Sequence, residues 1–291
     1  MLYHGFIQVF LLYIYIPLRP VCYRIIMVKG LILMLLFNLG TLSEHFRSTK
    51  SGEDLLHTQL EKRQGGDSYL WTSFFNQKSN AYLMALLKEW NIKTLFLSVN
   101  PTMDLAKLRS FKILASQNGI KVDFLIGENS YLEEDDGFTH LEKVMIEGRD
   151  LGFAGIHLDI EPHTFDDYHE NIKVYSKRQI KLYTQAKKWC AENGMDLSTS
   201  VPMHLPIEVA KNLSRNNITT YIMAYDHLSL EKKMDKTEAI RKILKNNYRW
   251  VFEIDDFPDY TSLQETENKL IEKGIKGLAY HDLSQMNLFK K

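Results

Sequence analysis

The chain has 291 residues, of which 45% are hydrophobic and 25% are charged, a composition typical of globular proteins. Lys and Arg together number 36, as do Asp and Glu, so the formal net charge is zero and no basic field is available to hold nucleic acid. The two cysteines, Cys22 and Cys190, provide neither the spacing of a zinc site nor a disulfide framework. We therefore expect no nucleic-acid partner, no metal and no cofactor.

Two apolar runs, 6–17 and 31–39, lie within residues 1–43. The second run follows Lys29 and precedes small residues, which is the layout of a secretory signal. Neither run reaches the roughly 20 apolar residues of a comfortable membrane span. Met27 is an alternative start of the chain, and an anchor made of both runs is the alternative to a signal peptide. Either way we expect the rest of the chain outside the cytoplasm, secreted, periplasmic or membrane-anchored, with membrane contact only through this segment.

Residues 44–67 are polar, end near Gly65 and Gly66, and are predicted to be a linker. From residue 68 to residue 291, short apolar or β-branched runs alternate with longer amphipathic stretches, as in a protein of strand–helix units. Eight strands are predicted in this region: 68–74, 92–99, 120–127, 153–160, 196–203, 218–225, 249–255 and 275–281.

A residue that tolerates the left-handed conformation stands just before each predicted strand from the second onward. Such residues end helices at little conformational cost, so each predicted helix has a stop signal. These residues are Asn91, Gly119, Gly152, Gly194, Asn217, Asn247 and Gly274.

Eight strand–helix units predict a parallel sheet covered by helices and closed into a barrel. The fold class is therefore α/β, a single-domain (β/α)8 TIM barrel at residues 68–291 that follows an N-terminal hydrophobic leader. The alternative is an open doubly wound sheet, which usually has a glycine-rich phosphate loop after its first strand. Residues 75–79 (FNQKS) follow the first predicted strand and contain no glycine, which favours the barrel.

The fourth predicted strand carries the ionisable residues His157, Asp159 and Glu161 at alternating positions. Alternation puts these three side chains on one face, and the active sites of such barrels lie at the C-terminal ends of the strands. Neighbouring carboxylates split their pKa values, so one of them can stay protonated as a general acid. The alternative interpretation is a polar cluster that only fills the barrel.

This strand resembles the fourth-strand motif D-G-x-D-x-D-x-E of family 18 glycoside hydrolases, the chitinase-like barrels. Gly155, Asp159 and Glu161 match the motif. Ala154 and His157 replace its two earlier aspartates. The resemblance is therefore that of a distant member.

A second motif of the same family, M-x-Y-D in the sixth strand, is matched by Met223, Tyr225 and Asp226. Two features depart from the family. The third strand continues as 125–129 (LIGEN) rather than S-x-G-G, and Tyr280 stands where the eighth strand usually supplies a tryptophan. The resemblance extends over residues 68–283 but rests on these two motifs.

The resemblance implies an exported glycoside hydrolase that cleaves a glycan containing N-acetylhexosamine by an acid-catalysed, substrate-assisted retaining mechanism. In that mechanism the 2-acetamido group of the substrate is the nucleophile. By this analogy Glu161 protonates the glycosidic oxygen and Asp159 holds the acetamido nitrogen. Tyr225 and Asp226 steady the acetamido oxygen.

The resemblance also suggests residues that bind the sugar. His157 stands where an aspartate supports its neighbour, and Met223 belongs to the sixth-strand motif. Trp71 and Tyr280 are aromatic residues near strand ends, and aromatic rings suit the apolar faces of sugars. The expected partner is a poly- or oligosaccharide, and we expect a monomer.

Three alternatives to this function remain open. One is a two-glutamate retaining glycosidase using Glu161 and Glu253, whose carboxylates would then lie about 5 Å apart. Another is a non-catalytic carbohydrate-binding barrel, suggested by the loss of the two upstream aspartates. The third is a metal-dependent hydrolase. Its ligands would come from His157, Asp159, Glu161, His163 and His281.

Overall fold

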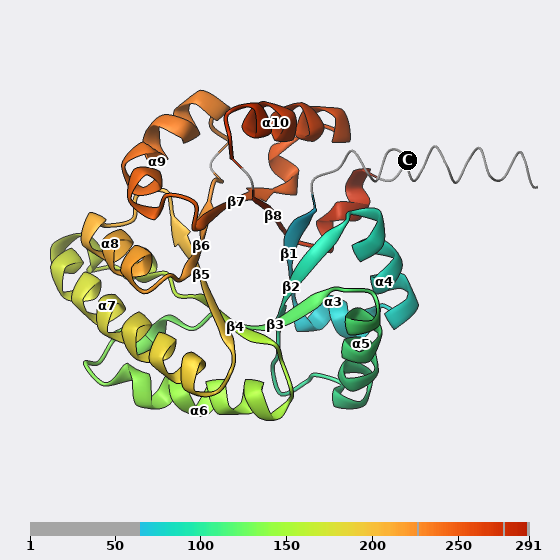
Figure 1. The fold of residues 1–291 in the computed structure, drawn as a ribbon, viewed down its shortest axis with the longest axis horizontal. Coiled ribbons are helices and arrows are strands. Elements are labelled where there is room, and N and C mark those ends of the chain that lie inside the picture. The colour runs from blue at the N-terminus through green and yellow to red at the C-terminus, as the bar shows by residue number, and fades with distance from the viewer. Residues whose placement is uncertain (1–64, 226, 276, 290–291) are drawn as a thin grey trace, which may run out of the picture. The chain divides into compact units, whose positions relative to one another are not determined.

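The computed structural model describes residues 65–225, 227–275 and 277–289, so the predicted leader and residues 44–64 of the predicted linker lie outside it. Eight parallel strands close into a barrel in sequence order, with β1 paired to β8 (Figure 1). The strands are β1 (Gly66–Leu70), β2 (Ile92–Ser98), β3 (Lys121–Ile126), β4 (Gly155–Asp159), β5 (Asp196–Pro202), β6 (Thr219–Met223), β7 (Tyr248–Glu253) and β8 (Leu278–His281). The predicted (β/α)8 barrel is confirmed.

Helices surround the strands on the outside of the barrel (Figure 1). They are α3 (Thr72–Gln77), α4 (Asn80–Glu89), α5 (Leu105–Gln117), α6 (Gly137–Asp150), α7 (Tyr168–Glu192), α8 (Ile207–Arg215), α9 (Leu230–Leu244) and α10 (Tyr260–Glu272). Short 3-10 helices follow several strands: η1 (Asn129–Leu132), η2 (Pro162–Thr164), η3 (Ile254–Asp256) and η4 (Gln285–Phe289). No helix among the described residues is long and apolar enough to cross a membrane.

Amphipathic periodicity explains how these helices pack, and α6 is a clear case. Its buried residues include Leu141, Met145 and Gly148, which recur at helical spacing on one face. A Cβ atom on Gly148 would lie 2.4 Å from the ring of Phe124 in β3. The glycine therefore lets α6 approach the sheet closely.

Left-handed residues before the strands are found at six of the seven predicted positions. Their φ angles are 50° at Asn91 and Asn217, 68° at Gly119, 75° at Gly152, 66° at Gly194 and 79° at Gly274. The prediction was wrong for Asn247, because α9 ends early and Lys245 takes the left-handed conformation with a φ of 58°.

The first strand is the element whose predicted bounds, 68–74, were least accurate. It begins at Gly66 and ends at Leu70, and residues Thr72–Gln77 form α3 instead. Contacts with β2 turn the chain here, since the Thr72 N–H donates to Ser98 Oγ at 3.0 Å and the Thr72 hydroxyl donates to Ser98 O at 2.8 Å. The strand therefore ends at Leu70, and the chain turns into α3 at Thr72.

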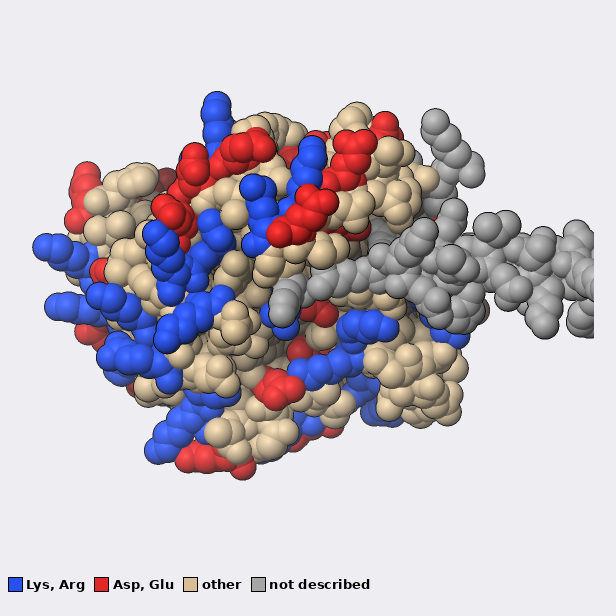
Figure 2. Space-filling view, turned by 45° about the horizontal axis from the view of Figure 1, so that its top comes forward, with Lys and Arg blue, Asp and Glu red and all other residues tan. Residues whose placement is uncertain are grey.

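Two apolar clusters form the core. The larger one fills the space between the strands and the helices. The smaller one lies inside the barrel and consists of Tyr69, Phe96, Leu125, Tyr221, Val251 and Ala279. On the outer surface, side chains of both charges are spread over the face in Figure 2, with basic ones prevailing on its left side, as suits a chain with no net charge.

Candidate active site

The fourth strand alternates as predicted. Ile156, Leu158 and Ile160 are fully buried in the outer core between strands and helices. His157 lies inside the barrel, where its ring stacks on that of Phe96 at a centroid distance of 3.8 Å. The polar side chains of this strand are therefore directed to the barrel interior, towards its C-terminal mouth.

His157 is fully buried and both of its ring nitrogens have hydroxyl partners. Nδ1 lies 2.8 Å from Ser198 Oγ, and Nε2 lies 2.8 Å from Ser200 Oγ and 3.3 Å from the Tyr69 hydroxyl. The Tyr69 hydroxyl and Ser200 Oγ are themselves 2.8 Å apart. A neutral imidazole has one donor and one acceptor nitrogen, and hydroxyls can match either.

Burial lowers the pKa of His157 to about 3, and the positive charge of Lys121 acts in the same direction. The ring is therefore neutral over the range in which proteins normally work. Where the family motif has an aspartate, this barrel has a neutral group. His157 does not reach solvent, so any influence on a substrate passes through Ser200 and Asp159.

Asp159 lies above His157 and is half-buried. The pKa of Asp159 is raised to about 7, chiefly by burial and also by the negative charge of Glu161, while a hydrogen bond from Ser200 opposes both effects. Its Oδ1 atom is buried and has no hydrogen-bond partner among the described residues. One carboxyl group at the mouth therefore holds a proton near neutral pH and has a free oxygen.

Glu161 follows the end of β4, and its side chain is 30% exposed. Its Oε2 atom lies 3.2 Å from Nε2 of His163. The backbone here is fixed by Asn129, whose Oδ1 accepts from the Glu161 N–H at 2.6 Å and whose Nδ2 donates to Thr164. The carboxyl is thus held at the mouth by the loop after β3, yet remains open to solvent.

Other strands bring aromatic and ionisable side chains to the same end of the barrel. Tyr225 follows β6, packs on the inner cluster and lies 5.6 Å from the ring of His281. Burial raises the pKa of Tyr225 well above its usual value, so its hydroxyl stays protonated. Trp71 follows β1 and packs on the inner cluster, with its ring 6.0 Å from that of His281. His281 Nδ1 lies 4.0 Å from Glu253 Oε1 at the end of β7.

Among the described residues, the predicted site residues lie along the barrel interior towards this mouth, except for Tyr280. Tyr280 points away from it, because alternation places Ala279 and His281 inside the barrel and Tyr280 outside. Tyr280 is fully buried in the outer core and donates to Glu267 Oε1 at 2.6 Å. The prediction that Tyr280 contacts substrate is therefore wrong for this structure.

The structure describes Met223 of the sixth-strand motif but not Asp226. Met223 is buried at the end of β6, two positions after Tyr221 of the inner cluster. Alternation therefore directs Met223 to the interior. Asp226 lies outside the described residues, so its predicted role stays a prediction.

The serines of β5 and Asn129 were not predicted as site residues. Ser198 and Ser200 occupy alternating positions of the predicted fifth strand, so both side chains lie on the same face. This alternation could have identified them as partners of His157 inside the barrel. No group of three or more described His, Cys, Asp or Glu residues is arranged to hold a metal ion. The hypothesis of a metal-dependent hydrolase gains no support, since both nitrogens of His157 already bond to serines.

Comparison with solved structures finds the same barrel in chitinases. A GH18 chitinase from Cycas revoluta, solved in complex with (GlcNAc)3, is 10% identical with a TM-score of 0.58, covering 77% of this chain and 96% of that chain. Active domain 2 of a chitinase from Pyrococcus furiosus is 12% identical with a TM-score of 0.55, covering 75% and 83%. No protein-family model and no curated protein matches the sequence. The chain has the barrel fold of the family 18 chitinases, as the motifs of its fourth and sixth strands predict.

Proposed function

We propose that the protein is an exported glycoside hydrolase that cleaves a glycan containing N-acetylhexosamine, with Glu161 as the general acid. The proposal rests on the pair formed by Asp159 and Glu161 at the C-terminal end of β4. One carboxyl is half-buried with a pKa raised to about 7, and the other is partly exposed beside it. Paired carboxylates in different environments are the usual basis for assigning acid and base roles.

The surroundings of this pair suit a substrate-assisted reaction. The unpartnered Oδ1 of Asp159 can accept from the N–H of a 2-acetamido group, which the substrate would use as its nucleophile. The Tyr225 hydroxyl, which stays protonated, can donate to the acetamido oxygen. Trp71 at the mouth offers a ring face to a sugar. The (GlcNAc)3 complex of the Cycas chitinase supports the same substrate class.

A second candidate function is carbohydrate binding without turnover. It is favoured by His157, which is neutral and buried where the family motif carries an aspartate. A neutral ring cannot supply the negative charge that an aspartate would place beneath Asp159. The two functions share a ligand class and differ only in bond cleavage.

Incubation with a panel of glycans separates these candidates. We would count new reducing ends released from chitin oligomers, peptidoglycan and acetylated exopolysaccharide, and measure binding to the same glycans. Release from an N-acetylhexosamine polymer supports the hydrolase. Binding with no release from any polymer would favour the second candidate, and neither binding nor release would contradict both.

The rate of hydrolysis is expected to fall as pH rises through about 7. Below this pH Asp159 holds a proton that it can share with Glu161, and above it this proton is lost. This fall in rate reflects the proton shared by the two carboxyls, so Asp159→Asn is expected to shift the pH at which the rate falls. The measurement is kcat/KM against pH for both proteins. A rate that stays flat from about pH 5 to about pH 9 would count against the shared proton.

A further inference from the structure

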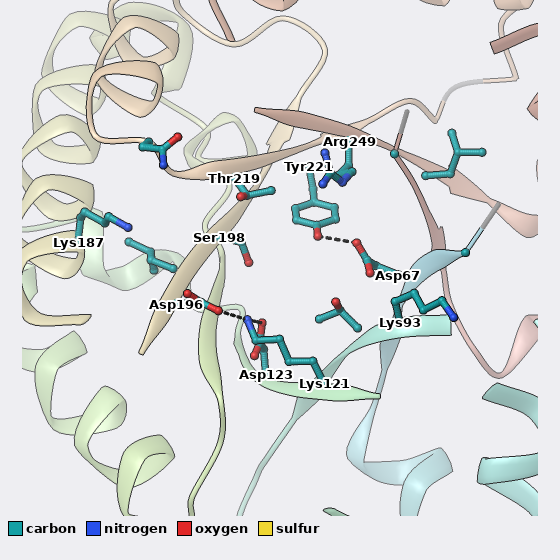
Figure 3. Close-up of a pocket in the computed structure, with 16 residues that line it drawn as sticks. Asp67, Lys93, Lys121, Asp123, Lys187, Asp196, Ser198, Thr219, Tyr221 and Arg249 are labelled. Carbon is teal, nitrogen blue, oxygen red and sulfur yellow. Dashed lines mark hydrogen bonds and ion pairs between the residues drawn. The ribbon is translucent and has the colours of Figure 1, made fainter. Parts of the chain in front are cut away.

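A cavity of about 490 Å³ opens at the N-terminal ends of the strands, at the opposite end of the barrel from Glu161. We call it the barrel-floor cavity. Its volume lies within the range of roughly 300–1,000 Å³ that small-molecule sites occupy. Figure 3 shows charged side chains from β1, β2, β3, β5, β7 and α7 around the rim of one common space. The charged side chains of the lining are Asp67, Lys93, Lys121, Asp123, Lys187, Asp196 and Arg249. The proposed hydrolysis assigns no role to this cavity.

Four of these side chains are basic and come from four different elements: Lys93 from β2, Lys121 from β3, Lys187 from α7 and Arg249 from β7. Lys121 is already paired, with Asp196 at 2.6 Å and Asp123 at 3.1 Å. Within the described part of the chain, Lys93 and Lys187 form no ion pair. In Figure 3 the Lys187 ammonium points towards the common space, whereas the Lys93 side chain runs away from it along the rim, so Lys187 is the cation that faces the cavity without an acidic partner from these residues.

Two glycines give charged side chains of this cavity their room. A Cβ atom on Gly277 would lie 1.7 Å from Cδ and 2.4 Å from Nε of Arg249. A Cβ atom on Gly155 would lie 2.8 Å from Oδ1 of Asp123. Neither glycine has a positive φ, so neither is required by backbone conformation. Their absent side chains instead allow Arg249 and Asp123 to lie at the barrel floor.

Two of the three acidic side chains of the cavity, Asp67 and Asp123, have pKa values raised by burial. Burial raises the pKa of Asp67, which accepts from the Tyr221 hydroxyl at 2.6 Å. Burial also raises the pKa of Asp123 to about 6, although Lys121 opposes this. The Oδ1 atom of Asp123 is buried and has no hydrogen-bond partner among the described residues. The third acidic residue, Asp196, is paired with Lys121 at 2.6 Å, so Lys187 and Arg249 are the cations left to attract an anion.

We propose that the barrel-floor cavity binds a small molecule that carries an oxyanion, a phosphate or a carboxylate, on a body no larger than a sugar. Arg249 supplies a guanidinium fork that matches the planar geometry of such groups, and Lys187 supplies a point charge. Asp67, Asp123 and Ser198 provide polar contacts for the rest of the ligand. This site is independent of the proposed hydrolysis at the mouth.

Calorimetric titration of the full chain tests the proposal with four probes: inorganic phosphate, glucose 6-phosphate, citrate and uncharged glucose. We expect saturable binding of at least one anion and none of glucose. Lys187→Gln and Arg249→Gln are expected to raise the Kd for that anion about tenfold, because a charge-assisted hydrogen bond is lost. The comparison of phosphates with citrate identifies which oxyanion the cavity prefers.

Lys188→Gln is the matched control, because Lys188 is the next residue of α7, is exposed and does not line the cavity. Its Kd is expected to equal that of the unmodified protein. Equal weakening by Lys187→Gln and Lys188→Gln would overturn the proposal, as would no saturable binding of any anion up to about 10 mM. Should Arg249→Gln fail to fold, the pair at positions 187 and 188 still decides.

Discussion

Replacement of Glu161 by glutamine is expected to lower the rate of glycan hydrolysis at least about 100-fold. Glutamine has the shape of glutamate but cannot protonate the leaving oxygen, so the loss measures general acid catalysis. The side chain is 30% exposed and glutamine has the same shape, so we expect the variant to fold normally. The measurement is the release of reducing ends under single-turnover and steady-state conditions, together with substrate binding.

Glu133→Gln is the control for this variant. Glu133 is an exposed glutamate that follows η1, in the connection between β3 and α6. Its substitution removes the same charge without touching the β4 carboxyl pair, and the rate is expected to stay the same. A Glu161→Gln protein that retains more than about a tenth of the normal rate would remove Glu161 from the role of acid. The two-glutamate alternative with Glu253 would then need to be tested by the same substitution at that position.

Replacement of His157 by glutamine is expected to make the protein less sensitive to acid. The pKa of His157 in the folded state, about 3, lies below the value of about 6.5 that it has in an unfolded chain. The unfolded state therefore binds more protons, and this residue's contribution to stability is full above about pH 6.5 and is lost as pH falls towards 3. Between about pH 7 and about pH 4.5 the loss amounts to roughly 2.5 kcal/mol.

The measurement is the free energy of unfolding by urea at both pH values for the two proteins. Asp123 and Asp159 have raised pKa values and change stability in the opposite direction, but they are present in both proteins and cancel in the difference. His140→Gln, at an exposed position of α6, is expected to keep the pH dependence of the unmodified protein. An equal loss of stability in the His157→Gln protein and the unmodified protein would contradict a buried neutral ring.

The order of the elements was predictable from sequence because it depends on local signals. Apolar runs and left-handed stop residues repeat along the chain, and each barrel strand pairs with its sequence neighbours. The position of the carboxyl pair was predictable for the same reason. Alternation in one strand decides that Asp159 faces inwards with His157, and no distant contact is needed for that inference.

Features that depend on contacts between distant strands were not predictable. The partners of His157 come from β5 and β1, and no local pattern in β4 specifies them. Tyr280 was misplaced because the inner face of β8 is set by its register against β7, where Phe252 pairs with Tyr280. The barrel-floor cavity was missed because its lining residues are scattered over strand starts, each of which looks like an ordinary solvent-facing residue in sequence.

The most direct test of the account compares chitin oligomers with their de-N-acetylated counterparts of equal length. If the substrate's own acetamido group is the nucleophile, held by Asp159 and Tyr225, only the acetylated oligomers can react. We would count reducing ends released by the unmodified protein from both, in parallel. We expect release from the acetylated oligomers and none from the de-N-acetylated ones. Equal release from both, or no release from the acetylated oligomers, would contradict it.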